Sequence, residues 1–301
     1  MLPICLVTGF LGTGKTTLLK NIVAKNRDRK IVYLINEFSV HDVDGAIVMA
    51  ENPDVVSIPG GSIFCKCLVT EFIGQLKKIV AMDGGLPVQS DPGGEIKSSR
   101  CEGVVIEASG MANPKIIEEM LVETKLNEHF RLATIISVLD ANSFLKLRHT
   151  LPNIIAQVES ADVVLINKTD CNSAKKNEEA RAAVRDLNPS ADCIQTVRCC
   201  LELDLFSEKA PRGLQGEYAA CRDPNYATFV TEEPFNGDLL ERFVAEHAED
   251  IYRIKGTLTD EFFDYSTTGA VRTPQPGAAS ALAWIVRGDV SEKIKAGLQS
   301  L

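Results

Sequence analysis

The chain has 301 residues, of which 45% are hydrophobic and 24% are charged, and its formal net charge is −9. These proportions are those of an ordinary globular protein with one large domain or two. The negative charge argues against a broad nucleic-acid-binding surface, so we expect no nucleic-acid partner. No apolar run reaches the length of a membrane span and the first residues lack a leader pattern. We therefore expect a cytoplasmic protein with no membrane association.

Short apolar runs and amphipathic runs alternate through the first two thirds of the chain. The apolar runs predict strands that are covered on both faces of a sheet. These strands are expected over residues 4–7, 31–35, 55–58, 103–106, 133–139, 163–166 and 192–196. Helices are expected after the first strand, over 69–82, from 113 onward and over 174–187. This alternation predicts an α/β fold with a doubly wound, mostly parallel sheet.

The last third of the chain follows a different pattern. Strands are expected over residues 226–230, 251–256, 262–267 and 282–287, and helices over 237–248 and 291–298. Grouped strands of this kind favour an antiparallel sheet in a small α+β domain. The stretch before them is rich in charge and glycine. We therefore expect a first domain over 1–204, a linker over 205–225 and a smaller domain over 226–301.

A glycine-rich stretch at residues 9–17 stands between the first expected strand and a helix. Its frame is G-x-x-x-x-G-K-[ST], in which backbone N–H groups surround the phosphates of a nucleotide. The expected phosphate-binding residues are Gly9, Gly12, Thr13, Gly14, Lys15, Thr16 and Thr17. Lys15 would reach the β- and γ-phosphates, and Thr16 would offer its hydroxyl to Mg²⁺. A simple glycine turn is the alternative, but it does not require the eight-position frame.

A second nucleotide signal, N-K-x-D, follows another expected strand and consists of Asn167, Lys168 and Asp170. A carboxylate at Asp170 can accept hydrogen bonds from the N1–H and N2–H₂ groups of guanine, whereas adenine would leave that charge unpaired. Lys168 can lay its stem against the base. A chance tetrapeptide in a polar loop is the alternative. The motif favours GTP over ATP and therefore makes a small-molecule kinase the least favoured function.

Acidic residues follow two of the expected strands. Glu37 and Asp44 follow one of them, and Glu107 and Gly110 follow the other. In open α/β sheets, ligands bind beyond the carboxyl ends of the strands. We therefore expect Glu37, Asp44 and Glu107 to surround Mg²⁺ and the γ-phosphate, and the N–H group of Gly110 to lie beside that phosphate. The expected catalytic residues are Lys15, Glu37 and Glu107, and the alternative for the Glu107 stretch is a turn that caps the next helix.

Nine cysteines are irregularly spaced along the chain. A disulfide framework is not expected in the reducing compartment of a P-loop protein. Cys65 and Cys67 follow a Gly-Gly turn, and two thiolates in a short turn can share one metal ion. Tetrahedral zinc needs four ligands, and His41 with Glu37, a client protein or the second copy of a homodimer could complete the set. The alternative is one buried and one exposed cysteine in a turn.

Taken together, the stretches at 9–19, 36–38, 107–110 and 167–170 resemble the CobW-type GTPases, a family that includes metal chaperones. The resemblance covers about 200 residues, and the C-terminal part is similar to the smaller domain of that family. It implies slow GTP hydrolysis with Mg²⁺, coupled to the delivery of a metal or metallocofactor to a client metalloprotein or corrinoid protein. The metal implied is Zn²⁺ or Co²⁺, or a corrinoid on the client.

The cysteine stretch departs from the Cys-x-Cys-Cys pattern of this family. Ser62 and Phe64 replace two of its cysteines, Cys65 matches the third, and Cys67 lies just outside the pattern. The altered motif suits the activation of a corrinoid-dependent enzyme, which stays as the alternative function.

Overall fold

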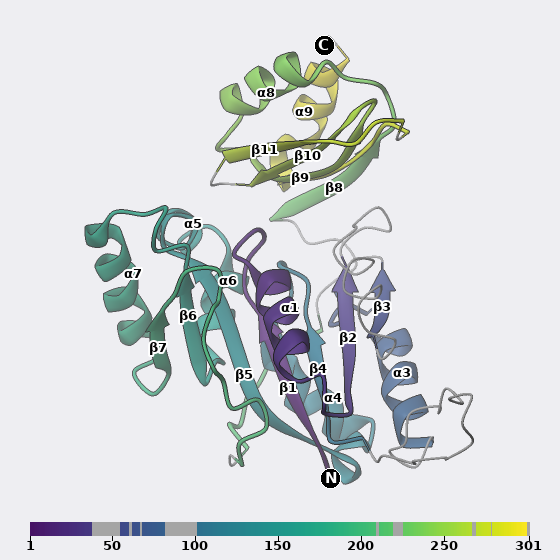
Figure 1. The fold of residues 1–301 in the computed structure, drawn as a ribbon, viewed down its shortest axis with the longest axis vertical. Coiled ribbons are helices and arrows are strands. Elements are labelled where there is room, and N and C mark those ends of the chain that lie inside the picture. The colour runs from purple at the N-terminus through teal and green to yellow at the C-terminus, as the bar shows by residue number, and fades with distance from the viewer. Residues whose placement is uncertain are drawn as a thin grey trace.

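The computed structural model describes residues 1–37, 55–59, 62–66, 68–81, 101–208, 211–218, 225–266, 269–277 and 279–299. Two sheets organise this part of the chain (Figure 1). The larger sheet has the order β3-β2-β4-β1-β5-β6-β7, and its described neighbours pair in parallel. Its strands are β1 (Leu2–Thr8), β2 (Ile31–Glu37), β3 (Val55–Pro59), β4 (Gly103–Glu107), β5 (Phe130–Asp140), β6 (Val163–Asn167) and β7 (Asp192–Gln195). The predicted α/β sheet is therefore confirmed.

Successive side chains of the strands point to opposite faces of the larger sheet, and both faces are covered. In β1, Ile4 and Leu6 pack on one face, whereas Cys5 and Val7 pack on the other. The helices on the first face are α3 (Val69–Ala81), α4 (Ile117–Glu123), α5 (Ala141–Leu147), α6 (Pro152–Glu159) and α7 (Ala174–Leu187). The second face is covered by α1 (Lys15–Lys25). Burial on both faces explains why these strands are apolar at nearly every position.

The apolar spacing of the sequence does not reveal three elements of the structure, which are α5, α6 and the edge strand β11 (Gly269–Pro274). α5 follows Asp140, whose carboxylate accepts hydrogen bonds from the N–H groups of Asn142 and Ser143 at 2.8 and 3.2 Å. It has seven residues, too few to establish a helical period. β11 is mostly exposed and lacks an alternation of buried and exposed positions. Such elements depend on their neighbours more than on their own pattern.

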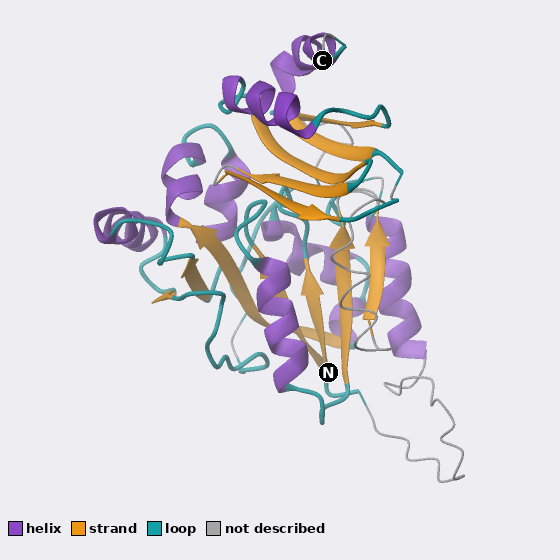
Figure 2. Ribbon diagram, turned by 45° about the horizontal axis from the view of Figure 1, so that its top comes forward, coloured by secondary structure: helices purple, strands orange, loops and turns teal. Residues whose placement is uncertain are grey.

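The smaller, C-terminal sheet is antiparallel and has the order β11-β10-β9-β12-β8. Its other strands are β8 (Tyr226–Thr231), β9 (Ile251–Leu258), β10 (Glu261–Ser266) and β12 (Ala281–Arg287). Helices α8 (Gly237–Glu246) and α9 (Ser291–Leu298) cover one face of it. Figures 1 and 2 show both helices on the side away from the larger sheet, so the other face looks toward the carboxyl ends of the parallel strands. None of the described helices is long and apolar enough to cross a membrane.

The C-terminal sheet packs onto the loop between β1 and α1. Phe10 of that loop meets Tyr252 of β9 edge to face, with ring centroids 6.3 Å apart and ring planes at 76°. Tyr252 and Ile285 of the C-terminal sheet belong to the same buried cluster as Phe10 and Leu11. This contact explains the two large apolar residues inside a glycine-rich loop, because they fill the space between the two sheets.

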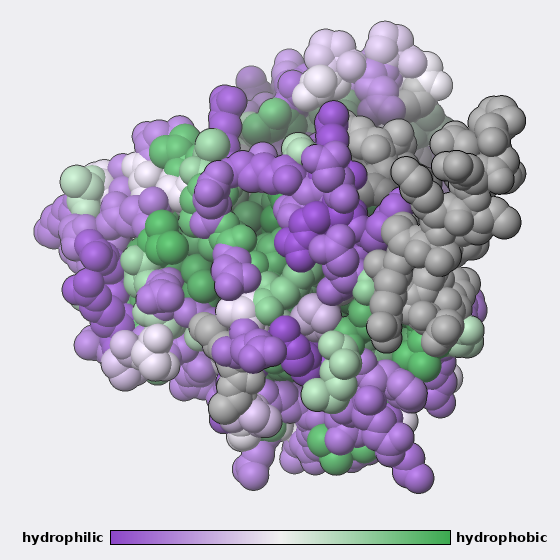
Figure 3. Space-filling view, turned by 60° about the horizontal axis from the view of Figure 1, so that its bottom comes forward, coloured by the Kyte–Doolittle hydropathy of each residue, from purple (hydrophilic) through white to green (hydrophobic). Residues whose placement is uncertain are grey.

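The opposite end of the larger sheet carries a hydrophobic groove. Figure 3 turns this end forward and shows apolar surface gathered near its centre. A cavity of about 1050 Å³ lies there between residues of α4, the start of β5 and residues 211–217. That last segment falls in the expected linker, yet Arg212 forms ion pairs with Asp162 and Glu118. In its described part, this segment is packed against the larger sheet.

Candidate nucleotide-binding site

The loop between β1 and α1 has a conformation that favours glycine. Gly12 and Gly14 have φ angles of +71° and +110°, a region that residues with a Cβ rarely adopt. Gly14 is the N-cap of α1, so the N–H groups of the first helical turn are directed out of the N-terminus of the helix. The Thr13 hydroxyl donates to the Phe10 carbonyl at 2.9 Å and holds the turn. The loop therefore presents backbone donors and the positive end of a helix dipole to one site.

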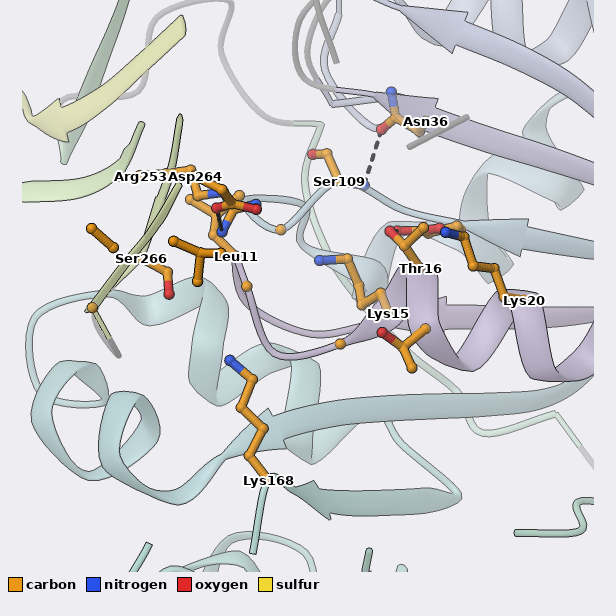
Figure 4. Close-up of a pocket in the computed structure, with 18 residues that line it drawn as sticks. Leu11, Lys15, Thr16, Lys20, Asn36, Ser109, Lys168, Arg253, Asp264 and Ser266 are labelled. Atoms are coloured by element: carbon orange, nitrogen blue, oxygen red, sulfur yellow. Dashed lines mark hydrogen bonds and ion pairs between the residues drawn. The ribbon is translucent and has the colours of Figure 1, made fainter. Parts of the chain in front are cut away.

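A pocket of about 370 Å³ lies over this loop and is lined by residues of both sheets (Figure 4). The larger sheet and its loops contribute Leu11, Gly12, Gly14, Lys15, Thr16, Thr17, Lys20, Asn36, Glu107, Ser109, Gly110 and Lys168. The C-terminal sheet and the residues after β10 contribute Arg253, Asp264, Ser266, Gly269, Ala270 and Val271. The pocket therefore brings together members of four motifs that are far apart in the sequence.

Lys15 lies at the base of this pocket, and only 8% of its surface is exposed. Its Nζ donates a hydrogen bond to the carbonyl of Phe10 at 3.1 Å, which holds the ammonium group along the loop. Figure 4 shows this amino group directed into the pocket. A nearly buried cation suits a polyanionic ligand, because phosphate oxygens can replace the hydration that burial removes.

Thr16 and Glu107 meet across the junction of α1 and β4. The Thr16 hydroxyl donates to Oε1 of Glu107 at 3.3 Å, and Glu107 is 6% exposed. β4 is the neighbour of β1 in the sheet, so its carboxyl end carries Glu107 to the side of the glycine-rich loop. A hydroxyl and a carboxylate are hard oxygen ligands of the kind that Mg²⁺ takes, together with water and phosphate oxygens. These two residues fit a Mg²⁺ ion that accompanies a bound nucleotide.

Asn36, at the end of β2, connects three segments behind the pocket. Its Oδ1 accepts hydrogen bonds from the N–H groups of Ser109 at 3.1 Å and of Ile63 at 3.0 Å. Its Nδ2 donates to the carbonyl of Ile58 at 3.1 Å. One buried side chain thus links the stretch after Glu107 to the stretch that contains the cysteine motif. The sequence placed Asn36 in a family motif but gave no signal that it bridges these two stretches.

The three residues of N-K-x-D have different surroundings. Asn167 is buried, and its side chain donates to the carbonyl of Thr13 at 2.9 Å and accepts from the N–H of Cys199 at 3.0 Å. It therefore braces the glycine-rich loop. Lys168 has a positive φ of 57° and lines the pocket. Asp170 is exposed and lies outside the residues that line the pocket.

The expected metal ligands are described only in part. Asp44, Cys67 and His41 lie outside the described residues, as does the side chain of Glu37. Among the residues that the structure describes, no group of three or more His, Cys, Asp and Glu side chains could hold a metal ion.

Cys65 is buried just before α3 and is disulfide-bonded. The sequence did not favour a disulfide framework, and it did not indicate this single bonded cysteine. The cysteines that are free in the described part are Cys5, Cys101, Cys171, Cys193, Cys199 and Cys200. A disulfide sulfur is not a thiolate, so metal ligation by Cys65 requires prior reduction.

The C-terminal sheet supplies pocket residues that no motif predicted. Arg253 of β9 forms a two-pronged ion pair with Asp264 of β10, with Nη1–Oδ1 and Nη2–Oδ2 distances of 2.8 and 3.0 Å. Figure 4 shows this pair beside Leu11, with Ser266 next to it. Two oppositely charged residues on adjacent strands are common, so the sequence gave no signal that they reach a loop near the N-terminus.

A parallel sheet whose first strand leads through G-x-x-x-x-G-K-[ST] into a helix defines a P-loop nucleotide-binding fold. The chain belongs to the CobW/HypB/UreG family, whose nucleotide-binding domain matches residues 3–195. The family suggested by the four motifs is therefore confirmed.

Named relatives share this domain at modest identity. The zinc chaperone YeiR of Escherichia coli is 29% identical over 177 residues, which cover 58% of this chain and 48% of YeiR. Zinc-regulated GTPase metalloprotein activator 1 of Schizosaccharomyces pombe is 25% identical over 241 residues, covering 74% and 54%. These matches span about half the length of each relative.

A further relative aligns along most of its length. The zinc chaperone YjiA of Escherichia coli is 26% identical over 275 residues, covering 85% of this chain and 81% of YjiA. The crystal structure of Zn(II)-bound YjiA GTPase aligns with 100% of this chain and 98% of its own, at a TM-score of 0.44 and 19% identity.

Proposed function

We propose that this protein is a GTP-hydrolysing metallochaperone, which couples its nucleotide state to the delivery of a metal or metallocofactor to a client protein. Membership of the CobW/HypB/UreG family supports a nucleotide-dependent function. The names of the relatives, zinc chaperone and GTPase metalloprotein activator, support a metal as the cargo. The pocket over the P-loop supports nucleotide binding on the chain's own residues.

In this proposal the phosphates lie over the P-loop and the base lies toward the N-K-x-D motif. Lys15 would neutralise charge on the β- and γ-phosphates, and the dipole of α1 would favour the same anionic groups. Thr16 and Glu107 would hold Mg²⁺, which neutralises further charge as the terminal phosphate leaves. Gly110, on the pocket wall after Glu107, would offer its N–H group to the γ-phosphate. Asp170, which is exposed, would select guanine at the end of the site where the base lies.

The observation that carries the coupling of nucleotide to metal is the pair of hydrogen bonds accepted by Asn36. Its Oδ1 holds the N–H of Ser109, two residues after Glu107, and the N–H of Ile63, two residues before Cys65. A shift of the Glu107 stretch toward a γ-phosphate would therefore change the support of the cysteine stretch. If GTP changes the metal affinity of Cys65 and Cys67 in this way, the metal must change the GTP affinity by the same factor.

Metal competition measurements test this function directly. The fully reduced protein is titrated with Zn²⁺ against a chromophoric chelator, in the presence of GDP or of a non-hydrolysable GTP analogue. We expect different metal affinities in the two nucleotide states, and a loss of that difference in the Cys65→Ser/Cys67→Ser variant. The exposed pair Cys171→Ser/Cys200→Ser is the matched control and should retain the difference.

Two outcomes would contradict the proposed coupling. One is an equal metal affinity in both nucleotide states, and the other is an unchanged affinity in the Cys65→Ser/Cys67→Ser variant. Repeating the titration with Co²⁺ separates the candidate cargoes. A nucleotide-dependent response to cobalt and not to zinc would favour a corrinoid-dependent client, for which the altered cysteine motif is suited.

A further inference from the structure

Arg253 lies against the P-loop, although it belongs to the C-terminal sheet. A Cβ built on Gly12 would lie 3.1 Å from its Nη1 atom and 2.9 Å from the Cβ of Ser266. The guanidinium group therefore fills the space beside Gly12, so that a side chain there would collide with it. Only 14% of the Arg253 side chain is exposed. The packing of Tyr252 on Phe10 positions β9 at this distance.

Arg253 lies at the end of the pocket where the proposed nucleotide would place its terminal phosphate. Figure 4 shows Arg253 and Lys168 on different sides of the P-loop, with Arg253 toward Ser109. Lys168 belongs to the base-reading motif, and Ser109 belongs to the stretch that follows Glu107. A nucleotide with its base toward Lys168 therefore extends its last phosphate toward Arg253.

The charges of the pocket leave room for an anion. Its lining contains four cationic side chains, Lys15, Lys20, Lys168 and Arg253, and two carboxylates, Glu107 and Asp264. Glu107 meets Thr16 at the expected Mg²⁺ position. Asp264 instead pairs with Arg253, and it remains 32% exposed. The carboxylate of Asp264 offers two oxygens to the two guanidinium nitrogens, which is the geometry that a phosphate also offers.

We propose that Arg253 binds the terminal phosphate of the bound nucleoside triphosphate, which takes the place of the Asp264 carboxylate on the guanidinium group. This inference rests on the proposed GTP function of the pocket. A nucleoside diphosphate lacks the terminal phosphate, so Arg253 keeps its pair with Asp264 in that state. The triphosphate therefore ties β9 to the P-loop, and the C-terminal sheet responds to the nucleotide state.

The test compares the affinity of the full chain for GDP and for a fluorescent, non-hydrolysable GTP analogue. We expect Arg253→Ala to weaken binding of the GTP analogue roughly tenfold to a hundredfold, because a charge-assisted hydrogen bond is lost. Binding of GDP should change by less than about twofold, since GDP has no group for Arg253 to hold. Arg253→Lys keeps the positive charge but not the two-pronged guanidinium geometry, so it should weaken binding of the GTP analogue by an intermediate factor.

Arg272→Ala is the matched control. Arg272 forms a similar two-pronged pair with Glu261 in the same sheet, with distances of 2.8 and 2.7 Å, and does not line the pocket. It should lose stability without changing the ratio of the two affinities. Equal effects of Arg253→Ala and Arg272→Ala on that ratio would mean that Arg253 only braces the sheet, and the proposal would be overturned.

Asp264→Asn supplies a second test that does not require Arg253→Ala to fold. It removes the competitor for the guanidinium group, so the GTP analogue should bind roughly two- to fivefold more tightly. If the tighter binding depends on the two-pronged guanidinium group of Arg253, it should disappear in the Arg253→Lys/Asp264→Asn variant. A purely structural ion pair predicts weaker binding or no change, and either result would contradict the proposal.

Lys15→Ala separates failure of this inference from failure of the proposed function. If the native protein binds neither nucleotide, or binds both independently of Lys15, the GTP function itself is wrong. If Lys15→Ala abolishes binding while Arg253→Ala leaves the preference for the triphosphate unchanged, the pocket binds GTP but the C-terminal sheet does not contact its terminal phosphate.

Discussion

The two ends of the candidate nucleotide site differ in how completely the protein encloses them. At the phosphate end, Lys15 and Glu107 are nearly buried and already hydrogen-bonded, and the C-terminal sheet closes the site above the P-loop. At the base end, Asp170 is exposed. Buried, prearranged charges interact strongly and do not reorganise when ligand arrives, whereas an exposed carboxylate is hydrated until a base covers it. Affinity should therefore reside at the closed end and selectivity at the open end.

Removing Lys15 should have the largest effect on GTP affinity, because it removes the buried cation of the enclosed phosphate end. We expect Lys15→Ala to weaken GTP binding by about 2–5 kcal/mol, roughly 30-fold to several thousand-fold, since a buried charge contact is lost. The fold should persist, because the amino group of Lys15 is directed into the pocket and not into an apolar core. Titration calorimetry measures the affinity, and Lys25→Ala at the other end of α1 is the control. Unchanged GTP binding by folded Lys15→Ala would refute the P-loop assignment.

Glu107→Gln should have the next largest effect. It keeps the shape of the side chain but removes the charge that would face Mg²⁺. We expect kcat for GTP to fall roughly tenfold to a hundredfold, with a smaller loss of nucleotide affinity and a higher Mg²⁺ requirement. Glu102→Gln is the matched control, because Glu102 precedes the same strand and pairs with Arg29 at its other end. A variant that loses affinity alone would assign Glu107 a structural role.

The closed end was also the part of the site that the sequence predicted best. Its P-loop is a continuous stretch in which strand, glycines and helix are neighbours in the chain, so the motif contains its own geometry. The larger sheet was predictable for a similar reason, because burial on both faces makes each strand an apolar run. Short-range order and strong apolar patterns can be read without knowing the tertiary contacts.

The part of the pocket that the C-terminal sheet supplies could not be predicted, because it depends on contacts between distant segments. In the sequence, Arg253 and Asp264 look like an ordinary cross-strand ion pair. They reach the P-loop only because Tyr252 packs on Phe10 and places β9 over it. The bridging role of Asn36 was hidden in the same way, since its three partners come from two stretches that are distant from it in the sequence. The disulfide of Cys65 was also missed, because spacing alone does not set the oxidation state of a thiol.

The base end of the site is tested by replacing the carboxylate of Asp170, which would hydrogen-bond to the guanine base. We expect Asp170→Asn to lower GTP affinity about tenfold, at the low end for a charged hydrogen bond because the carboxylate is exposed. The new amide can donate to the C2 carbonyl of xanthine, so affinity for xanthosine triphosphate should rise. Calorimetry with both nucleotides decides this. Equal affinity of the native protein for ATP and GTP would show that the base is not read at this position.

The smallest effect is expected at two adjacent cysteines, of which Cys199 contacts the P-loop and Cys200 is exposed. Cys199 is buried, with its Sγ 3.6 Å from the Gly14 carbonyl and its N–H bonded to Asn167, whereas Cys200 is exposed. Burial raises the pKa of the Cys199 thiol from 9.0 to about 12, although nearby Lys168 opposes the shift. Cys199 should therefore remain a neutral, unreactive thiol at pH 8, while iodoacetamide modifies Cys200.

The raised pKa of Cys199 also sets a pH window for stability. Below pH 9 this thiol is neutral in both the folded and the unfolded chain, so its contribution is constant. Above pH 9 the unfolded chain ionises first and binds fewer protons, so its contribution to folding should be lost progressively up to about pH 12. Mass spectrometry after alkylation at pH 8, with and without denaturant, measures how far Cys199 and Cys200 are each modified. The Cys199→Ser variant identifies which signal belongs to Cys199. Equal modification of both cysteines in the native protein would show that its contacts with Gly14 and Asn167 do not protect Cys199.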